Sequence, residues 1–272
     1  MDAVVFELGR FGDRRRERAG AALHRALAEN PGSCIRQLGG TRAREMRFHR
    51  FLRNKHVGVE EMALTAGTRT AERAAGRDVV VIQDTSEVVI GGLEARRAGF
   101  GPVGGGGATG GVLVHAAIVV DARKGALLGT LDVKVWNREG GEKQAKRGRA
   151  LVEKESYRWL EVTETAARLL GGARSVTMVS DAESDMYELF AGRPSDVHLL
   201  IRATRERCLL EGGTLTAKLA AEPPAARIVR TIPAAPGRPE RTATLTLRFM
   251  PVEITAPPAL PKSLPRSCAL HA

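Results

Sequence analysis

Two aspartates, each at the end of a short apolar run, are the residues of this chain best suited to chemistry. Asp84 follows the run 79–83, and Asp181 follows the run 176–180. Runs of β-branched and apolar residues closed by polar residues predict buried strands, so both carboxylates are expected at the rim of a sheet. On neighbouring strands they could share a divalent cation, because Mg²⁺ is held by one or two carboxylates plus water and substrate phosphate. The alternative for each acid alone is a turn residue or a helix N-cap.

The charge of the chain favours a polyanionic partner. Its 272 residues carry 42 Lys and Arg against 31 Asp and Glu, a net charge of +11. Residues 1–77 hold 16 of these cations and 9 of the acids, so the basic excess is concentrated at the front. Nucleic acid is the partner that this balance predicts first.

The cysteines and the apolar segments exclude several classes of protein. Cys34, Cys208 and Cys268 are scattered and odd in number, which supports neither a zinc site nor a disulfide framework and fits a reducing cytoplasm. The first residues lack the apolar core of a signal peptide. No apolar run reaches the roughly 18 residues of a membrane span, so we expect no membrane association.

The order of the expected elements predicts an α/β fold behind a helical domain. Residues 1–77 indicate three helices, at 14–29, 43–52 and 59–75. The region 78–203 then indicates strands at 79–83, 112–120, 126–136, 175–180 and 197–202, with helices at 153–170 and 184–191. Three antiparallel strands followed by parallel βα units predict a mixed five-stranded sheet with helices on its faces. This is the RNase-H-like pattern, and Asp84 and Asp181 occupy the ends of its first and fourth strands.

The remaining segments indicate less regular structure. The Gly-rich stretch 91–111 lacks the Gly-Lys-Ser/Thr ending of a phosphate-binding P-loop, so we reject a nucleotide site. It is either a flexible loop or a loop that becomes ordered on DNA phosphates. Residues 204–254 alternate in the manner of strands and predict a β-rich insertion. Residues 255–272 are Pro-rich without periodicity, and we expect disorder there.

Several ordered segments between residues 8 and 253 resemble one known family. They are Leu8-Gly9 with Gly12-Asp13-Arg14-Arg15, Arg50-Phe51-Leu52-Arg53-Asn54, Ile82-Gln83-Asp84-Thr85-Ser86, Val114-His115, Glu153-Lys154-Glu155-Ser156 with Trp159-Leu160, Asp181-Ala182-Glu183-Ser184-Asp185, and the strand closing in Arg202. Together they resemble the cut-and-paste DDE transposases of bacterial insertion sequences, in the branch typified by transposon Tn-five (the insertion-sequence-four superfamily).

The resemblance implies a metal-dependent reaction on DNA. In this family three carboxylates hold two Mg²⁺ or Mn²⁺ ions that drive phosphodiester hydrolysis and strand transfer at transposon ends. Asp84 and Asp181 match the first two carboxylates. Glu183 and Asp185 match the acids just after the second, and we expect them to hydrogen-bond to the metal ligands or to lie at a helix N-terminus. His115 is expected to be structural. The residues expected to contact DNA are Arg14, Arg15, Arg50, Arg53, Asn54, Lys55 and Arg202.

The resemblance also implies partners and a location. The implied partner is the double-stranded DNA of transposon ends, and the chain could form a homodimer or a heterodimer with a full-length transposase. The implied location is the bacterial cytoplasm, in association with the nucleoid.

The sequence departs from the family at the third carboxylate. The family carries this Glu in a Tyr-Arg signature on a helix after the insertion, and we find no such segment. We therefore expect a truncated transposase that is catalytically weak or inactive alone, with a sheet face near Val80, Ile82, Val176 and Val179 left exposed. Two alternatives remain open: a non-catalytic DNA-binding or dimerising fragment that inhibits a full-length transposase, and a two-carboxylate nuclease of the same fold.

Overall fold

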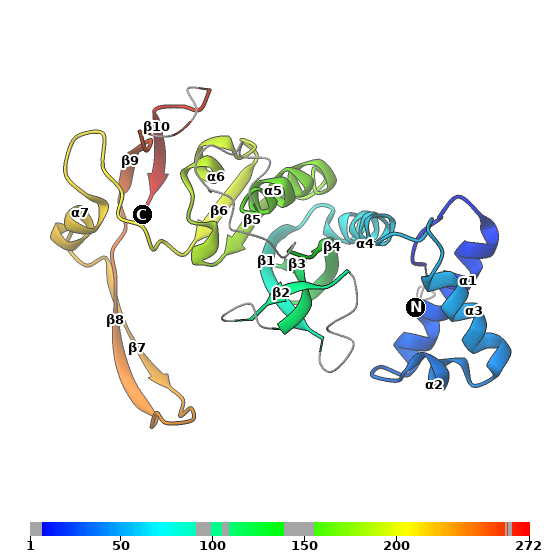
Figure 1. The fold of residues 1–272 in the computed structure, drawn as a ribbon. Helices are drawn as coiled ribbons and strands as arrows, with labels where there is room; N and C mark the ends of the chain where they lie inside the picture. Colours follow the sequence, from blue (N-terminus) through cyan, green and yellow to red (C-terminus); the bar gives the residue numbers. More distant parts are fainter. Residues whose placement is uncertain (1–6, 91–98, 105–108, 139–154, 259, 261–262) are drawn as a thin grey trace. The chain divides into compact units, whose positions relative to one another are not determined.

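The chain forms two compact units of mixed α/β structure. The computed structural model describes residues 7–90, 99–104, 109–138, 155–258, 260 and 263–272. One unit comprises residues 1–181 with 194–201, and the other comprises 182–193 with 202–272. The first contains a group of N-terminal helices and a large sheet, and the second contains two small two-stranded sheets (Figure 1).

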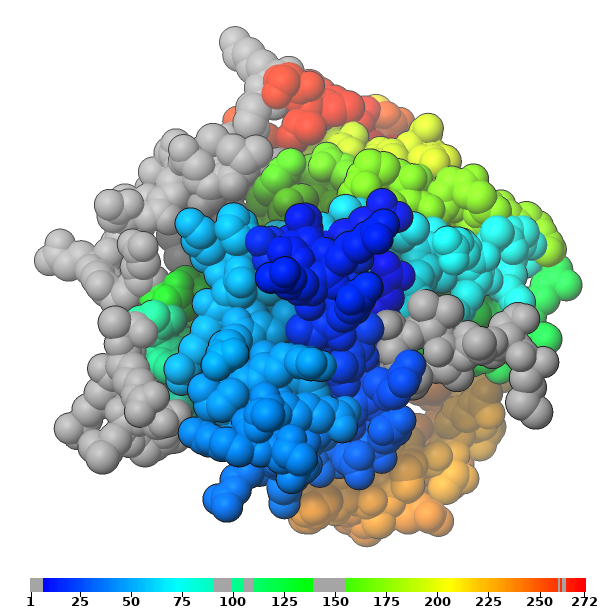
Figure 2. All heavy atoms as spheres, turned by 90° about the vertical axis from the view of Figure 1, so that its right-hand side faces the viewer, coloured from blue at the N-terminus to red at the C-terminus, as the bar shows by residue number. Residues whose placement is uncertain are grey.

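The N-terminal helices enclose a small aromatic core. They are α1 (Arg14–Glu29), α2 (Ile35–Gly39) and α3 (Arg42–Leu52), drawn in blue in Figures 1 and 2. Asp13 caps α1 by accepting a hydrogen bond from the Arg15 N–H, as an N-cap side chain does. A Cβ atom at Gly20 would stand 2.9 Å from the Phe51 ring, so glycine permits the close approach of α1 to that ring. The helices of residues 1–77 therefore form as the sequence predicts, with α2 in addition.

The large sheet is mixed, as predicted, and has one short strand more than expected. Its strands are β1 (Asp78–Val89), β2 (Gly101–Val103), β3 (Thr109–Asp121), β4 (Leu127–Trp136), β5 (Ser175–Ser180) and β6 (Val197–Ile201). Their order is β4–β3–β1–β5–β6, with β2 beside β3 on the same edge as β4. β3 is antiparallel to β1, β2 and β4, whereas β5 is parallel to β1 and β6.

One face of this sheet carries the main core. Helices α4 (Val59–Ala74) and α5 (Tyr157–Leu169) contribute to it. The core residues are Ala74, Val79, Val81, Ala117, Val119, Leu131, Val162, Ala166, Leu170, Val176, Met178 and Val197. Gly67 of α4 lies so close to the Leu131 carbonyl that any side chain there would collide with it. Side chains alternate between the two faces of a strand, so the odd-numbered Val79 and Val81 of β1 and the even-numbered Val176 and Met178 of β5 share the face covered by the two helices.

The opposite face of the sheet is partly open to solvent. Ile82 is 40% exposed and Leu200 is 63% exposed, while Val80 and Val179 are half-buried. Of the residues expected on an exposed apolar face, Ile82 is exposed, whereas Val80 and Val179 are half-buried. Val176 is not part of this face, because it alternates onto the core face and is 6% exposed.

The second unit is built around Tyr187, Leu209, Val252 and Ile254. It contains the short 3-10 helix Ala182–Ser184, α6 (Tyr187–Gly192), α7 (Leu215–Ala221), and the strands β7 (Ala226–Ile232), β8 (Arg241–Leu247), β9 (Pro251–Thr255) and β10 (Ser267–His271). β7 pairs with β8 in a largely exposed hairpin, and β9 pairs with β10. None of the helices among the described residues is long and apolar enough to cross a membrane.

Two expectations about the second unit differ from the structure. Residues 255–272 are not disordered throughout, because residues 267–271 form β10 and pair with β9. Tyr187 also donates a hydrogen bond to the Pro265 carbonyl at 2.9 Å, and Cys268 and Leu270 pack on the core of this unit. The prolines precede β10 rather than interrupt it, so they do not prevent pairing. Residues 182–193, expected within the core at 78–203, belong instead to the second unit.

Candidate functional site

Asp84 and Asp181 both lie just beyond the paired part of the two central parallel strands. β1 and β5 are parallel, and their pairing runs from Asp78 opposite Ser175 to Ile82 opposite Val179. Continued by two residues, this register brings Asp84 opposite Asp181, the residue directly after β5. Neighbouring strands lie about 4.8 Å apart, so the two acids would stand at one level of the sheet if this register continued beyond the end of β5.

Both aspartates belong to the solvent-facing side of the sheet. Asp84 alternates with the buried Gln83, and Asp181 alternates with the buried Ser180, so each shares the face of Ile82 and Val179. Directly opposed residues of paired strands project to the same face. Both residues are exposed. The sequence predicted that these acids converge, and the register is compatible with that prediction.

Thr85 connects Asp84 to a polar network under the other face of the sheet. Its backbone N–H donates to the Asp84 carboxylate at 2.7 Å. Its hydroxyl lies 2.8 Å from His115 Nδ1 on β3, and Arg158 of α5 donates to that hydroxyl from Nε at 2.9 Å. His115 Nε2 is 3.2 Å from Gln83 Oε1. Hydrogen bonds on the core face of the sheet thus fix Gln83 and Thr85, the two neighbours of Asp84, while the Asp84 carboxylate lies on the solvent-facing side.

The hydrogen bonds assign the protonation of His115. A guanidinium can only donate, so the Thr85 hydroxyl accepts from Arg158. Gln83 Oε1 can only accept, so the ring nitrogen that contacts it must donate, and His115 Nδ1 is left to accept from the Thr85 hydroxyl. The ring proton therefore sits on Nε2 and is donated to Gln83. Burial of the ring, helped by the positive charges of Arg158 and Lys134, lowers the pKa of His115 to about 4. A neutral histidine packed edge-on to Trp159 at 4.6 Å is a structural residue, as the sequence indicated.

Arg138 and Glu155 extend this region toward the Gly-rich segment. Arg138 binds Glu155 through two hydrogen bonds, of 2.9 and 3.1 Å, and lies 3.5 Å from Glu87. These contacts, the Arg138 hydrogen bond first, lower the pKa of the Glu155 carboxyl despite its partial burial. Glu87 also accepts from the Gly104 N–H at 2.7 Å. Glu153, Lys154 and most of the stretch 91–111 lie outside the described residues, so their expected roles remain expectations.

The two acids expected to support the metal ligands differ in their surroundings. Glu183 is exposed within the short 3-10 helix. Asp185 is buried and accepts from the N–H groups of Thr204 and Arg205 at 2.7 Å each, and it forms an ion pair with Arg207. Burial alone would raise its pKa, but these hydrogen bonds and the Arg207 charge lower it. Asp185 therefore anchors the segment 204–207 within the second unit.

The residues expected to contact DNA are mostly exposed, and those of the N-terminal helices lie at the start of α1 or at the end of α3. Arg14 and Arg15 begin α1, while Arg50, Arg53 and Lys55 lie at or just after the end of α3. The rings of Phe11 and Phe51 stack edge to face at 5.3 Å, which joins these two ends. Asn54 instead accepts from the His56 N–H at 3.0 Å and shapes a turn. Arg202 is exposed directly after β6.

The carboxylates of Asp84 and Asp181 are suitable ligands for Mg²⁺ or Mn²⁺, but the described residues do not supply a third ligand beside them. Carboxylates are the side chains that these cations prefer. Within the described part of the chain, no group of three or more His, Cys, Asp or Glu residues is close enough to hold a metal ion. The third carboxylate that the sequence failed to supply is thus not supplied by the fold of the described residues either.

Sequence reasoning overlooked the network beneath Asp84, although a signal for it was present. Gln83 and Thr85 flank Asp84, and strand alternation must point them to the face opposite the aspartate. A polar pair on a core face needs partners, and His115 was the polar residue in an otherwise apolar strand. Arg158 could not be found in this way, because only the packing of α5 brings it to Thr85.

The sequence matches no family model, and no curated protein matches it significantly.

Proposed function

We propose that this chain is a DNA-binding protein of the DDE transposase type, in which Asp84 and Asp181 are metal-binding catalytic residues. The observation that supports the proposal is the parallel register of β1 and β5, because continuing it by two residues past Ile82 and Val179 would set Asp84 opposite Asp181, and both residues are exposed. The strand order β4–β3–β1–β5–β6, with three antiparallel strands and then two parallel ones, supports an RNase-H-like sheet.

The proposed reaction has two steps at transposon ends: hydrolysis of a DNA phosphodiester bond by water, and transfer of the freed strand, whose 3′-hydroxyl forms a new phosphodiester bond as the old one breaks. A bound Mg²⁺ or Mn²⁺ would supply an activated nucleophile and stabilise the leaving oxygen. In this chain, the Thr85 N–H orients the Asp84 carboxylate, and the hydrogen bonds of Thr85 to His115 and Arg158 fix the strand from which Asp84 projects. Two carboxylates hold such an ion more weakly than three, so we expect slow turnover by the chain alone.

The basic N-terminal helices support DNA binding. Phe11 contacts Phe51, and we infer from this contact that Arg14 and Arg15 at the start of α1 lie near Arg50, Arg53 and Lys55 at the end of α3. Five cations at one end of a small helical group can contact several phosphates at once. Such binding weakens steeply as the salt concentration rises, because each neutralised phosphate releases counterions.

A second candidate function is a non-catalytic DNA-binding or dimerising fragment that inhibits a full-length transposase. The absence of a third metal ligand near the two aspartates, within the part of the chain described by the structure, favours this candidate. It shares DNA binding with the first candidate and differs from it in requiring no metal.

Nicking of supercoiled plasmid DNA by the full chain distinguishes the two candidates. We expect slow nicking that requires Mg²⁺ or Mn²⁺ and that falls by roughly 100-fold or more in Asp84→Asn and in Asp181→Asn, since losing a member of a catalytic unit costs orders of magnitude. Glu87→Gln is the matched control, because Glu87 lies on the same strand but on the opposite face from Asp84. DNA binding without any metal-dependent nicking would support the non-catalytic candidate instead.

A further inference from the structure

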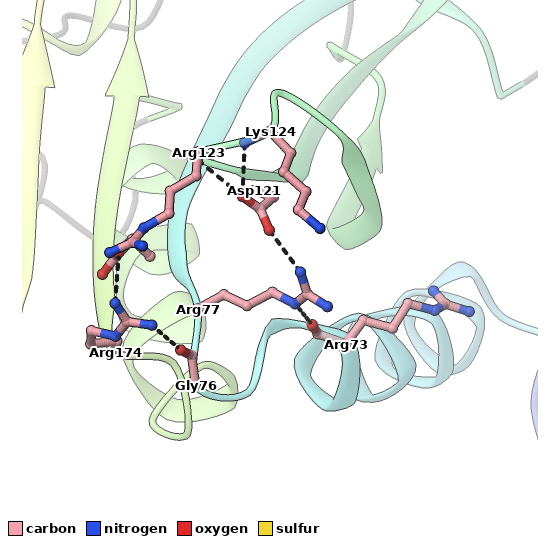
Figure 3. Close-up of polar contacts among 8 residues, drawn as sticks. Arg73, Gly76, Arg77, Asp121, Arg123, Lys124 and Arg174 are labelled. Carbon is pink, nitrogen blue, oxygen red and sulfur yellow. Dashed lines mark hydrogen bonds and ion pairs between the residues drawn. The ribbon is translucent and has the colours of Figure 1, made fainter.

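A cluster of cationic side chains lies at the end of the sheet where β1 begins. We call Arg73, Arg77, Arg123, Lys124 and Arg174 the basic corner (Figure 3). Arg73 and Arg77 come from the end of α4 and the residues after it, Arg123 and Lys124 from the β3–β4 turn, and Arg174 from the residue before β5. Asp84 lies six residues further along β1, about 20 Å away at strand spacing, so the basic corner is distinct from the metal site.

The two carboxylates in the basic corner are occupied in holding it together. Asp78 accepts from Arg123 Nε and Arg174 Nη1 at 3.2 Å each, and from the Ser175 hydroxyl at 3.0 Å. Asp121 accepts from Arg77 Nη1 at 2.8 Å and from the N–H groups of Arg123 and Lys124. The hydrogen bond from Arg77 holds the pKa of Asp121 below its usual range, so this acid stays ionised. Five cations against two carboxylates leave three positive charges in excess.

The guanidinium groups are fixed in place yet remain open to solvent. Arg77 Nε donates to the Arg73 carbonyl and Arg174 Nη2 donates to the Gly76 carbonyl, both at 2.8 Å. The side chains of Arg77, Arg123 and Arg174 are nevertheless 44%, 73% and 55% exposed. A guanidinium has five N–H donors in a rigid fork, and these contacts use only one or two of each. Binding a phosphate would therefore cost little additional side-chain entropy.

We propose that the basic corner binds the phosphodiester backbone of double-stranded DNA. This inference rests on the proposed function and adds to it a second DNA contact, separate from the N-terminal helices. Most protein–DNA hydrogen bonds run from Arg, Lys and backbone N–H groups to phosphate oxygens, whereas protein interfaces are depleted of Lys and need an apolar centre. Asp196 lies at the same end of the sheet but one strand further, before β6, so the positive excess is confined to β3, β1 and β5.

The test is the salt dependence of duplex DNA binding by the full chain. Fluorescence anisotropy with a labelled duplex is followed between low and moderate NaCl for the wild type and for Arg123→Gln/Lys124→Gln/Arg174→Gln. The slope of log K against log salt is about 0.9 per neutralised phosphate, so losing three contacts should reduce it by about 2.7 and weaken binding at low salt by roughly 100-fold. A matched control removes the same charge from the exposed hairpin, Arg227→Gln/Arg238→Gln/Arg241→Gln.

A second variant and a thermal melt separate DNA contact from folding. Arg123→Lys/Arg174→Lys keeps the charge and should keep most of the slope, while Lys124→Gln alone touches no side-chain ion pair of the basic corner and should still reduce the slope by about 0.9. The inference is overturned if the slope of the triple variant equals that of the wild type, or falls no further than that of the hairpin control. If the thermal melt shows that the triple variant is unfolded, the slope measured for Lys124→Gln decides whether the basic corner contacts DNA.

A further variant tests the proposed function in the same assay. Arg50→Gln/Arg53→Gln/Lys55→Gln probes the N-terminal helices. Loss of binding in this variant, with wild-type binding in the basic-corner variant, refutes the inference and leaves the proposed function standing. A wild-type chain that binds no duplex at low salt refutes both.

Discussion

Protonation of His115 should destabilise the folded chain over a defined pH range. Its imidazole is fully buried, and its pKa of about 4 lies well below the 6.5 of an exposed histidine. Between these values the unfolded chain binds a proton that the folded chain does not, so stability falls as the pH falls from 6.5 towards 4. Each pKa unit corresponds to about 1.4 kcal/mol, which gives about 3 kcal/mol in total and about 2.5 kcal/mol between pH 7 and pH 4.5.

Urea unfolding followed by tryptophan fluorescence measures this effect. The two tryptophans of the chain, Trp136 and Trp159, both lie near His115 and Arg158, so their fluorescence reports on the large sheet. Other acids also titrate in this range, so the quantity to compare is the loss in free energy of unfolding for the wild type minus that for His115→Gln. We expect this difference to be about 2.5 kcal/mol between pH 7 and pH 4.5.

Two results would refute the reasoning about His115. Equal losses of stability in the wild type and in His115→Gln would mean that the imidazole is not held neutral by the fold. An NMR titration of the folded chain in which the His115 ring protonates near pH 6.5 would mean the same, and would remove the assigned hydrogen bonds to Thr85 and Gln83.

Three further predictions follow from buried contacts. Thr85→Val should cost about 1–3 kcal/mol in urea unfolding, because it leaves His115 Nδ1 and Arg158 Nε without their partner, whereas Thr85→Ser should cost less; equal costs would argue against the hydroxyl network. Ile254→Ala should destabilise the second unit by about 2–5 kcal/mol, since this side chain is fully buried, and limited proteolysis of residues 202–272 should reveal it; unchanged proteolysis would show that the core of this unit is misassigned. Asp185→Asn should lower the free energy of unfolding by about 3 kcal/mol, because it leaves the Arg207 charge unpaired. Because the pKa of Asp185 is lowered in the folded chain, the variant should also lose less stability than the wild type as the pH falls through that pKa. An equal loss of stability at acid pH in both proteins would show that the ion pair does not cause it.

Helices and strands with strong periodicity could be read from the sequence with little error. The helix expected at 14–29 and the strand expected at 175–180 have the observed bounds, since Asp13 caps the first and Asp181 ends the run of the second. The strand expected at 79–83 continues to Val89, because its second half extends past β5 and pairs with β3 alone, where its side chains are mostly exposed. Local hydrophobicity marks only the buried half of such a strand.

Segments whose structure depends on distant partners could not be predicted. β10 reads as a Pro-rich tail, yet pairing with β9 orders it. The assignment of residues 182–193 to the second unit depends on Asp185 and Tyr187, which bind residues 204–207 and Pro265. Each of these contacts joins positions far apart in the chain, and single-sequence patterns carry no information on such pairing.

The sequence could identify the two acids of the candidate site, but it could not identify the residues that hold them in place. Strand ends identified Asp84 and Asp181 as candidates, and the parallel register of β1 and β5, which ends two residues before them, is compatible with their convergence. The role expected for Asp185 behind the metal ligands is not supported, since its carboxylate binds the segment 204–207. The basic corner was not found, because its cations come from three segments that the fold brings together.

Binding of Mn²⁺ tests most directly whether Asp84 and Asp181 form one metal site. Electron paramagnetic resonance of free Mn²⁺, titrated with the full chain, gives the affinity of the wild type, of Asp84→Asn, of Asp181→Asn and of the double variant, with Glu87→Gln as control. If both carboxylates hold the same ion, each single substitution weakens binding about tenfold or more, the double variant is little worse than either, and the control is unchanged. Wild-type affinity in either single variant, or independent effects that add fully in the double variant, would contradict the proposal that the two aspartates share a metal.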